Sequence, residues 1–229
     1  MQSPAKFTRS SDLVPHSEFA EISVIGGGGI GSFLIQLLAV MGYRQINLFE
    51  FDTVEIHNAG CGLFGEKDVG EEKAEVARAR AEYYGATLIP MGRFNEDSEV
   101  TAHMAVCPDD LPVRLLAYRK WREKFEGNGS ALFVDGRMGG VAVELHTELA
   151  NAVSEYPSTI NPDAVEEEAT CARRHTVFTG AFAATLMAMT ISAMVNKQAY
   201  RKFLNISTIP YFDMQNPSDL TKLVQPIES

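Results

Sequence analysis

The feature that most constrains the fold is a glycine-rich turn between two apolar segments within residues 22–41. An apolar strand runs into a turn that reads GGGGIG, and an apolar helix follows at once. Gly26, Gly28 and Gly31 fit the pattern G-x-G-x-x-G in a strand–turn–helix context. Glycines let a phosphate approach main-chain N–H groups, and the helix N-terminus adds its positive dipole end. The stretch predicts a nucleotide-binding, Rossmann-like unit, with a purely structural turn as the alternative.

A second predicted strand, over residues 45–51, carries an acid near its end. This acid, Glu50, lies 19 residues after Gly31, close to the offset of about 20 at which an acid binds ribose hydroxyls in Rossmann-like units. A long polar loop follows over residues 51–64. Because open parallel sheets bind ligands at the carboxyl ends of their strands, we expect this loop to border a binding site.

Strand and helix patterns alternate along the rest of the chain. Helices are predicted over 71–84, with Ala74, Ala77 and Ala81 on the packing face, over 111–125 and over 177–195; strands are predicted over 86–90, 104–107, 131–134, 141–149 and 206–212. We see no repeat and no linker, so we expect one α/β domain over residues 1–229. Its fold class is a Rossmann-like, mostly parallel sheet with helices on both faces and a C-terminal apolar helix. Residues 1–20 form an N-terminal arm, and residues 151–175 form a loop.

Three further polar residues stand out near predicted helix starts. Lys73 lies in the first turn of its helix, where a lysine opposes the helix dipole, which favours a functional role. Asp109 and Asp110 follow a predicted strand. Such a pair can hold magnesium beside a phosphate, or it can cap the next helix. The sequence leaves both readings of the pair open.

Composition narrows the functional classes. The net charge of -10 and the pI near 5.0 argue against generic nucleic-acid binding, which needs a basic surface. Cys61, Cys107 and Cys171 are far apart in the sequence and contain no C-x-x-C pair, so neither a zinc ribbon nor a disulfide framework is predicted. The polar N-terminal segment has no apolar signal core. We therefore expect a cytoplasmic protein.

One segment approaches the length of a membrane-spanning helix. Residues 177–195 carry no charge over 19 positions. The segment is rich in Ala, Thr and Ser and lacks the density of Leu and Ile of a typical span. We interpret it as a helix buried in the core or at a dimer interface, and expect no membrane association.

Several motifs in order resemble the ThiF/MoeB-type adenylyltransferases of the ubiquitin-activating enzyme superfamily, and the later part of the chain resembles a prokaryotic ThiF-like branch. The matching residues are Gly26-Gly27-Gly28-Gly29-Ile30-Gly31-Ser32, Glu50-Phe51-Asp52, Val54-Glu55 with Asn58, Leu63-Phe64, Asp68-Val69-Gly70 with Lys73-Ala74, and Asp109-Asp110 with Arg114. Their order and spacing agree across residues 22–114.

The resemblance implies a reaction with ATP and Mg²⁺. Such enzymes activate the C-terminal carboxylate of a ubiquitin-like protein ending in Gly-Gly as an acyl-adenylate and release pyrophosphate. By the same resemblance, Gly26, Gly28, Gly29 and Gly31 line the nucleotide loop, Glu50 holds the ribose, Asp52 and Asn58 lie near the ribose and phosphates, Lys73 neutralises phosphate charge, and Asp109 helps hold magnesium. The family also implies a homodimer, and a conjugating enzyme or sulfurtransferase as a further partner.

The chain lacks one positively charged residue of the family pattern. Where the family usually has an arginine that reaches the phosphates, this chain has Cys61. Arg137, after a predicted strand, and Arg9, in the N-terminal arm, are candidate substitutes. Cys171, on the family's crossover loop, is a candidate thioester nucleophile, with a structural cysteine as the alternative.

Two other functions fit part of the pattern. A nicotinamide- or flavin-dependent oxidoreductase accounts for the glycines and Glu50, and leaves Lys73 and Asp109 unexplained. A catalytically weak or inactive subunit that binds a partner accounts for the cysteine at position 61. Adenylation remains the leading hypothesis, because it accounts for most of the motifs.

Overall fold

The computed structural model describes residues 4–10, 14, 16, 19–140, 142–160 and 176–207. The strands are β1 (Glu21–Ile25), β2 (Gln45–Phe49), β3 (Thr87–Pro90), β4 (His103–Val106), β5 (Leu132–Gly139), β6 (Ala142–Leu149) and β7 (Phe203–Ser207). The α-helices are α1 (Gly31–Met41), α2 (Lys73–Tyr83), α3 (Leu111–Phe125) and α5 (Val177–Val195). Short 3₁₀ helices are η1 (Pro4–Phe7), η3 (Ile56–Gly60), η4 (Glu66–Asp68) and η5 (Tyr156–Thr159).

The strands form one seven-stranded sheet in the order β3-β2-β1-β4-β5-β6-β7. Strands β1 to β5 pair in parallel, whereas β6 runs antiparallel to both β5 and β7. The strand order reverses at β1, which lies between β2 and β4. This confirms the predicted Rossmann-like, mostly parallel sheet, and it places the switch point, where such sheets bind ligands, directly after β1.

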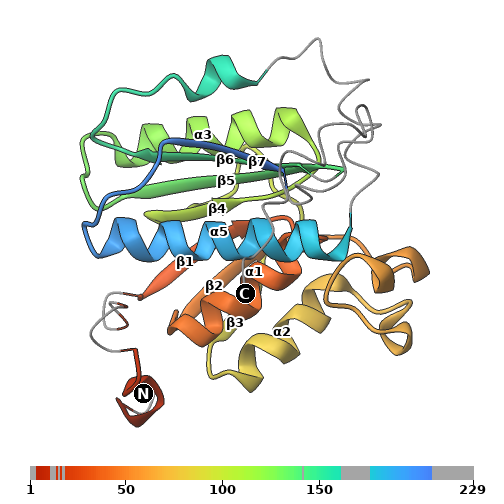
Figure 1. Cartoon of the computed structure of the whole chain (residues 1–229). Coiled ribbons are helices and arrows are strands. Elements are labelled where there is room, and N and C mark those ends of the chain that lie inside the picture. Colours follow the sequence, from red (N-terminus) through yellow and green to blue (C-terminus); the bar gives the residue numbers. More distant parts are fainter. Residues whose placement is uncertain are drawn as a thin grey trace, which may run out of the picture.

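Helices cover both faces of the sheet, as predicted (Figure 1). One core lies between the sheet and the helices α1, α2 and α5, and includes the buried Ala74, Ala77 and Ala81. The other core lies on the α3 side and is built on the aromatic residues Trp121, Phe133 and Tyr156. The strands contribute side chains to both cores, because each strand alternates its residues between the two faces of the sheet.

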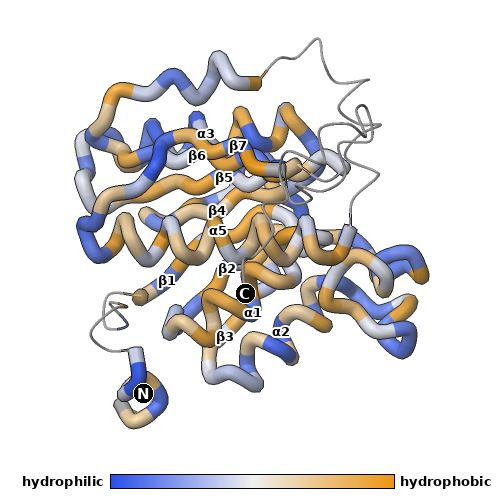
Figure 2. Tube along the Cα trace, in the orientation of Figure 1, coloured by the Kyte–Doolittle hydropathy of each residue, from blue (hydrophilic) through white to orange (hydrophobic). Residues whose placement is uncertain are grey.

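The helix α5 is the long apolar segment, and its bounds match the predicted range. Figure 2 shows it in mostly hydrophobic colours along its length. By length and composition, α5 is the one described helix able to cross a membrane. It packs instead against α1, β5 and β6, through Thr179, Gly180, Ala183, Ala184, Met187, Ala188, Ile191 and Met194. Burial of this face agrees with the interpretation as a core helix.

Two predicted strand boundaries were wrong by more than two residues. Strand β5 continues through Gly139 instead of ending at Val134, because it pairs with β6 over eight residues. Strand β7 begins at Phe203, earlier than the predicted residue 206, because Phe203 already pairs with His146 on β6. Much of the predicted 151–175 loop, including Cys171, lies outside the described residues. The single-domain boundary 1–229 stays a prediction.

Candidate functional site

The glycine turn lies at the switch point, between the end of β1 and the start of α1. Gly31 packs so closely that an added Cβ would lie 1.9 Å from the carbonyl oxygen of Gly26. Gly26 itself has a φ of +88°, which disfavours any other residue. By contrast, a Cβ on Gly28 would meet nothing within 4 Å. The turn is therefore closely packed at Gly26 and Gly31 and open at Gly28.

The amide groups of the open part of the turn are available for a ligand. Within the part of the chain that the structure describes, no hydrogen bond uses the amides of Gly28, Gly29 or Ile30. They precede the first turn of α1, which has no side-chain cap. Free amides at a helix N-terminus form a site for a phosphate or another anion.

Glu50 ties the glycine turn to the end of β2. One carboxylate oxygen, Oε2, accepts a hydrogen bond from the amide of Gly27 at 2.8 Å. The other, Oε1, accepts from the amides of Phe51 at 2.8 Å and Asp52 at 2.9 Å. The side chain is buried. Glu50 thus fixes the shape of the site from within the protein, a contribution that the predicted ribose contact does not include.

Lys73 and Asp52 form an ion pair beside the turn. Lys73 Nζ lies 3.3 Å from Asp52 Oδ2, and the side chains are 11% and 52% exposed, respectively. The backbone fixes this pairing, because the amide of Lys73 donates to the carbonyl of Asp52 at 2.9 Å, and Thr53 forms a bridge with Glu72. The unusual place of a lysine in the first helical turn therefore results in a cation held at the carboxyl end of β2.

The polar loop between β2 and α2 closes over the start of α1. Asn58 accepts a hydrogen bond from the amide of Glu55 at 2.8 Å and forms a capping box with it, so it stabilises η3. Ser32, in the first turn of α1, accepts from the amide of Leu63 at 3.0 Å. Burial raises the pKa of the Cys61 thiol, and the nearby Lys73 opposes this rise. Lys73, Cys61 and the start of α1 are therefore neighbours.

The acids after β4 divide into one cap and one open group. Asp110 accepts a hydrogen bond from the amide of Val113 at 3.1 Å, so it is the N-cap of α3. Asp109 is exposed in front of it. Among the described residues, no group of three or more His, Cys, Asp or Glu side chains is arranged to hold a metal. A Mg²⁺ bound through Asp109 would complete its coordination with water and phosphate oxygens.

Neither candidate arginine lies free beside the glycine turn. Arg137 donates to Asp135 at 2.8 Å, to Glu144 at 3.1 Å and to both oxygens of Thr159 at 3.1 Å. These partners engage the guanidinium within the protein. Arg9 is exposed on the N-terminal arm, which reaches the C-terminal ends of α1 and α2 through contacts of Lys6 with Ala39 and Tyr84. That end is opposite the glycine turn (Figure 1).

Sequence reasoning missed a buried polar network behind Asp109. Asp135, fully buried, accepts hydrogen bonds from Arg114, Arg137 and the hydroxyl of Tyr156, the last at 2.8 Å. The one feature of the sequence that pointed to this network was the position of Asp135, directly after the apolar residues 131–134. Its partners come from α3, β5 and η5, so no local pattern connects them.

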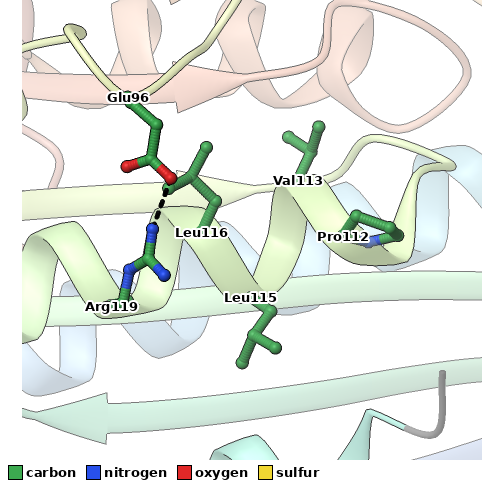
Figure 3. A pocket seen from close by; sticks show the side chains of 6 residues that line it. All are labelled: Glu96, Pro112, Val113, Leu115, Leu116 and Arg119. Carbon is green, nitrogen blue, oxygen red and sulfur yellow. Dashed lines mark hydrogen bonds and ion pairs between the residues drawn. The ribbon is translucent and has the colours of Figure 1, made fainter.

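A pocket lies apart from this site, on the outer surface of α3. It has a volume of about 350 Å³ and is lined by Glu96, Pro112, Val113, Leu115, Leu116 and Arg119. Figure 3 shows Glu96 and Arg119 facing each other across it, with an ion pair of 2.5 Å. None of the glycine-turn residues lines it. We therefore place the candidate site on the open glycine turn and not in this pocket.

The fold and the site define a Rossmann-like α/β protein with a glycine turn at its switch point whose amides are open to a ligand. Residues 12–88 match the model of the ThiF family. The NEDD8-activating enzyme E1 catalytic subunit of Caenorhabditis elegans is 47% identical over 60 residues, which cover 26% of this chain and 14% of that protein. SUMO-activating enzyme subunit 2 of Dictyostelium discoideum is 32% identical over 84 residues, which cover 36% of this chain and 11% of that protein. The chain therefore matches only a small part of either relative.

Solved structures share the fold over most of the chain. The structure of E. coli MccB with AMPCPP and MccA has a TM-score of 0.67 and 13% identity, and the match covers 90% of this chain and 72% of that one. The structure of PaaA has a TM-score of 0.64 and 13% identity, and the match covers 84% of this chain and 62% of that one. The family match over residues 12–88 and the shared fold agree with the predicted resemblance to the ThiF/MoeB-type, E1-like superfamily.

Proposed function

We propose that this chain binds Mg²⁺-ATP at the glycine turn and adenylates the C-terminal glycine carboxylate of a small ubiquitin-like protein that ends in Gly-Gly, releasing pyrophosphate. The observation that carries the proposal is the pairing of open amides at Gly28, Gly29 and Ile30 with a cation, Lys73, at the same sheet edge. Both features stabilise phosphate, and the negative charge that develops on the phosphates during adenylyl transfer to the carboxylate needs such fixed donors.

We assign each described residue of the site a role in binding the nucleotide or the metal. The turn from Gly26 to Gly31 holds the phosphates, and Lys73 neutralises their charge once the nucleotide competes with Asp52 for it. Asp109 contributes a carboxylate oxygen to Mg²⁺, which when bound offsets phosphate charge. Asn58 holds the loop that closes the site.

The ribose role of Glu50 is compatible with its structural bonds. A carboxylate offers about four lone-pair sites, and three of them are used by backbone amides. One acceptor site remains for a ribose hydroxyl. We therefore propose that Glu50 both shapes the turn and contacts the ribose.

The relatives support the class of substrate. Those that match by sequence are named as activating enzymes for NEDD8 and SUMO, and MccB has been solved with ATP and with MccA. We propose a small-protein substrate for this chain by analogy. We also propose a cytoplasmic homodimer, a conjugating enzyme or sulfurtransferase as the next partner, and a thioester at Cys171, which lies outside the described residues.

A second candidate function has one observation in its favour. Arg137 is engaged inside the protein and Arg9 lies at the far end of α1, so neither supplies the second phosphate cation within one chain. A subunit that needs a cation from a partner chain, or that only binds a partner, fits this arrangement. The two candidates differ in whether purified protein alone releases pyrophosphate.

The test is ATP–pyrophosphate exchange with a panel of ubiquitin-like proteins, each paired with a variant that lacks the terminal glycine. Adenylation predicts exchange only with an intact Gly-Gly terminus, and loss of exchange in Lys73→Ala. A stable complex with a ubiquitin-like protein without exchange would support the partner-dependent subunit. Absence of both exchange and complex formation across the panel would contradict the proposal.

A further inference from the structure

The side chain of Arg114 points from α3 into the sheet, beneath the acid proposed to hold magnesium. Arg114 is 5% exposed and its partner Asp135 is fully buried. One nitrogen, Nη1, donates to the Asp135 carboxylate and, at 3.2 Å, to the carbonyl of Gly136. The other, Nη2, donates to the carbonyl of Pro108. A single guanidinium therefore joins the end of β5 to the residue before Asp109.

The segment that carries Asp109 is fixed on both sides by α3. On one side, the carbonyl of Pro108 is held by Arg114. On the other, Asp110 caps the helix through the amide of Val113. Pro108 also packs against the glycine turn, since a Cβ on Gly26 would lie 2.9 Å from its nitrogen. The direction in which Asp109 leaves the backbone thus depends on the contact of Arg114 with Pro108.

The chemistry of this contact needs an arginine. The planar guanidinium has five donors in a fixed fork, so it reaches a carboxylate and two carbonyls at once. Burial lowers the pKa of Arg114 to about 10, so the side chain stays charged at neutral pH. A lysine retains a charge for Asp135, but its single ammonium cannot keep the same three partners.

We propose that Arg114 is a positioning residue for the metal-binding acid: through the Pro108 carbonyl and the Asp135 carboxylate, it sets the place of Asp109 relative to the glycine turn. The proposal rests on the proposed function for the role of Asp109. It goes beyond that function by assigning a residue that touches neither nucleotide nor metal. Tyr156 supports the same unit, because its hydroxyl donates to Asp135 at 2.8 Å.

The test compares Arg114→Lys with Arg122→Lys, a matched substitution on the same helix. Arg122 donates to the carbonyl of Leu149 at 3.3 Å, at the other end of α3. The first readout is amide hydrogen exchange of Cys107 and Val113, whose hydrogen-bonded amides flank the segment from Pro108 to Asp110, in the protein without nucleotide. Loss of one net hydrogen bond predicts up to about tenfold faster exchange there in Arg114→Lys. Arg122→Lys leaves this exchange unchanged.

The second readout is the Mg²⁺ concentration that gives half of the ATP-induced rise in melting temperature. We expect a several-fold increase in Arg114→Lys and no change in Arg122→Lys, an effect that a loss of stability alone does not produce. If Arg114→Lys does not fold, Tyr156→Phe replaces it, with smaller changes in the same directions.

The outcomes separate the two proposals. Unchanged exchange at Cys107 and Val113 in the folded variant, or an unchanged Mg²⁺ requirement beside a normal ATP response, would overturn the positioning role. Absence of any response of the wild type to Mg²⁺-ATP would defeat the proposed function, while the exchange data would still show whether Arg114 holds the segment.

Discussion

The Oε2 atom of Glu50 lies 2.8 Å from the amide nitrogen of Gly27 and joins the end of β2 to the glycine turn. Because Oε1 is also bonded to backbone amides, Glu50→Gln must turn its NH₂ group toward one of these donors. We expect the free energy of unfolding to fall by about 1–3 kcal/mol without any nucleotide. Denaturant unfolding measures this. Unchanged stability with lost ATP affinity would show that Glu50 acts on the ligand alone.

Two glycines of the same turn predict opposite phenotypes. Gly31→Ala places a Cβ 1.9 Å from a backbone oxygen, so we expect a loss of roughly 1–3 kcal/mol or more. Gly28→Ala enters open space, so the change in stability should stay within about 0.5 kcal/mol. The added methyl group should nevertheless weaken ATP binding, because it occupies the side open to the phosphates. Wild-type ATP affinity in Gly28→Ala would argue against nucleotide binding over this turn.

Glu148 predicts a pH dependence of stability. It is 6% exposed, and its Oε2 has no hydrogen-bond partner among the described residues. Burial raises the pKa of Glu148 above its ordinary value of 4.5. The carboxyl therefore contributes stability below pH 4.5 that is lost as the pH rises through its folded-state pKa. Relative to wild type, Glu148→Gln should gain about 1 kcal/mol between pH 4 and pH 7.

The control for this pH dependence is Glu99→Gln. The hydrogen bond from Lys124 lowers the pKa of Glu99, so its ionised form is the stabilising one. Glu99→Gln removes this ionised carboxylate. The stability of the variant relative to wild type should therefore fall as the pH rises, whereas that of Glu148→Gln should increase. Urea unfolding at a series of pH values checks both variants. A pH-independent difference for Glu148→Gln would contradict the account.

The outer face of α5 predicts the proposed homodimer. Phe178, Phe182 and Met189 are 49%, 36% and 63% exposed on this helix. Exposed apolar side chains gathered on one helix face are typical of an interface. Phe182→Glu with Met189→Glu should therefore give a monomer in light scattering, whereas Val153→Glu, at an exposed loop position, should not. A wild-type protein that is monomeric at micromolar concentration would refute the dimer.

Local sequence signals predicted the helices well. The bounds of α3 and α5 match the predicted ranges 111–125 and 177–195, because their starts carry capping residues. Asp110 caps α3, and Thr176 accepts from the amide of Thr179 at 3.3 Å to cap α5. The glycine turn and the fold class were equally readable, since strand, turn and helix follow one another directly.

Non-local contacts account for what the sequence did not reveal. Arg137 was a candidate phosphate ligand because it follows an apolar strand, yet it is engaged by Glu144 on β6 and Thr159 in η5. Asp135 draws its partners from three elements far apart in the chain. Likewise, the bonds of Glu50 to the glycine turn depend on the β1–β2 pairing. Such contacts depend on how the elements pack, which no local pattern encodes.

The central claim is that the glycine turn and Lys73 bind Mg²⁺-ATP, and thermal shift measurements with Mg²⁺-ATP, NADH and FAD test it most directly. Ligand at about 100 times its Kd stabilises the fold by roughly 2.7 kcal/mol, a rise of about 5 °C or more. We predict this rise with Mg²⁺-ATP alone in the wild type and in the control Lys67→Ala, and its loss in Lys73→Ala and Asp109→Ala. A rise with NADH or FAD but not with Mg²⁺-ATP, or an undiminished rise in Lys73→Ala, would contradict the claim.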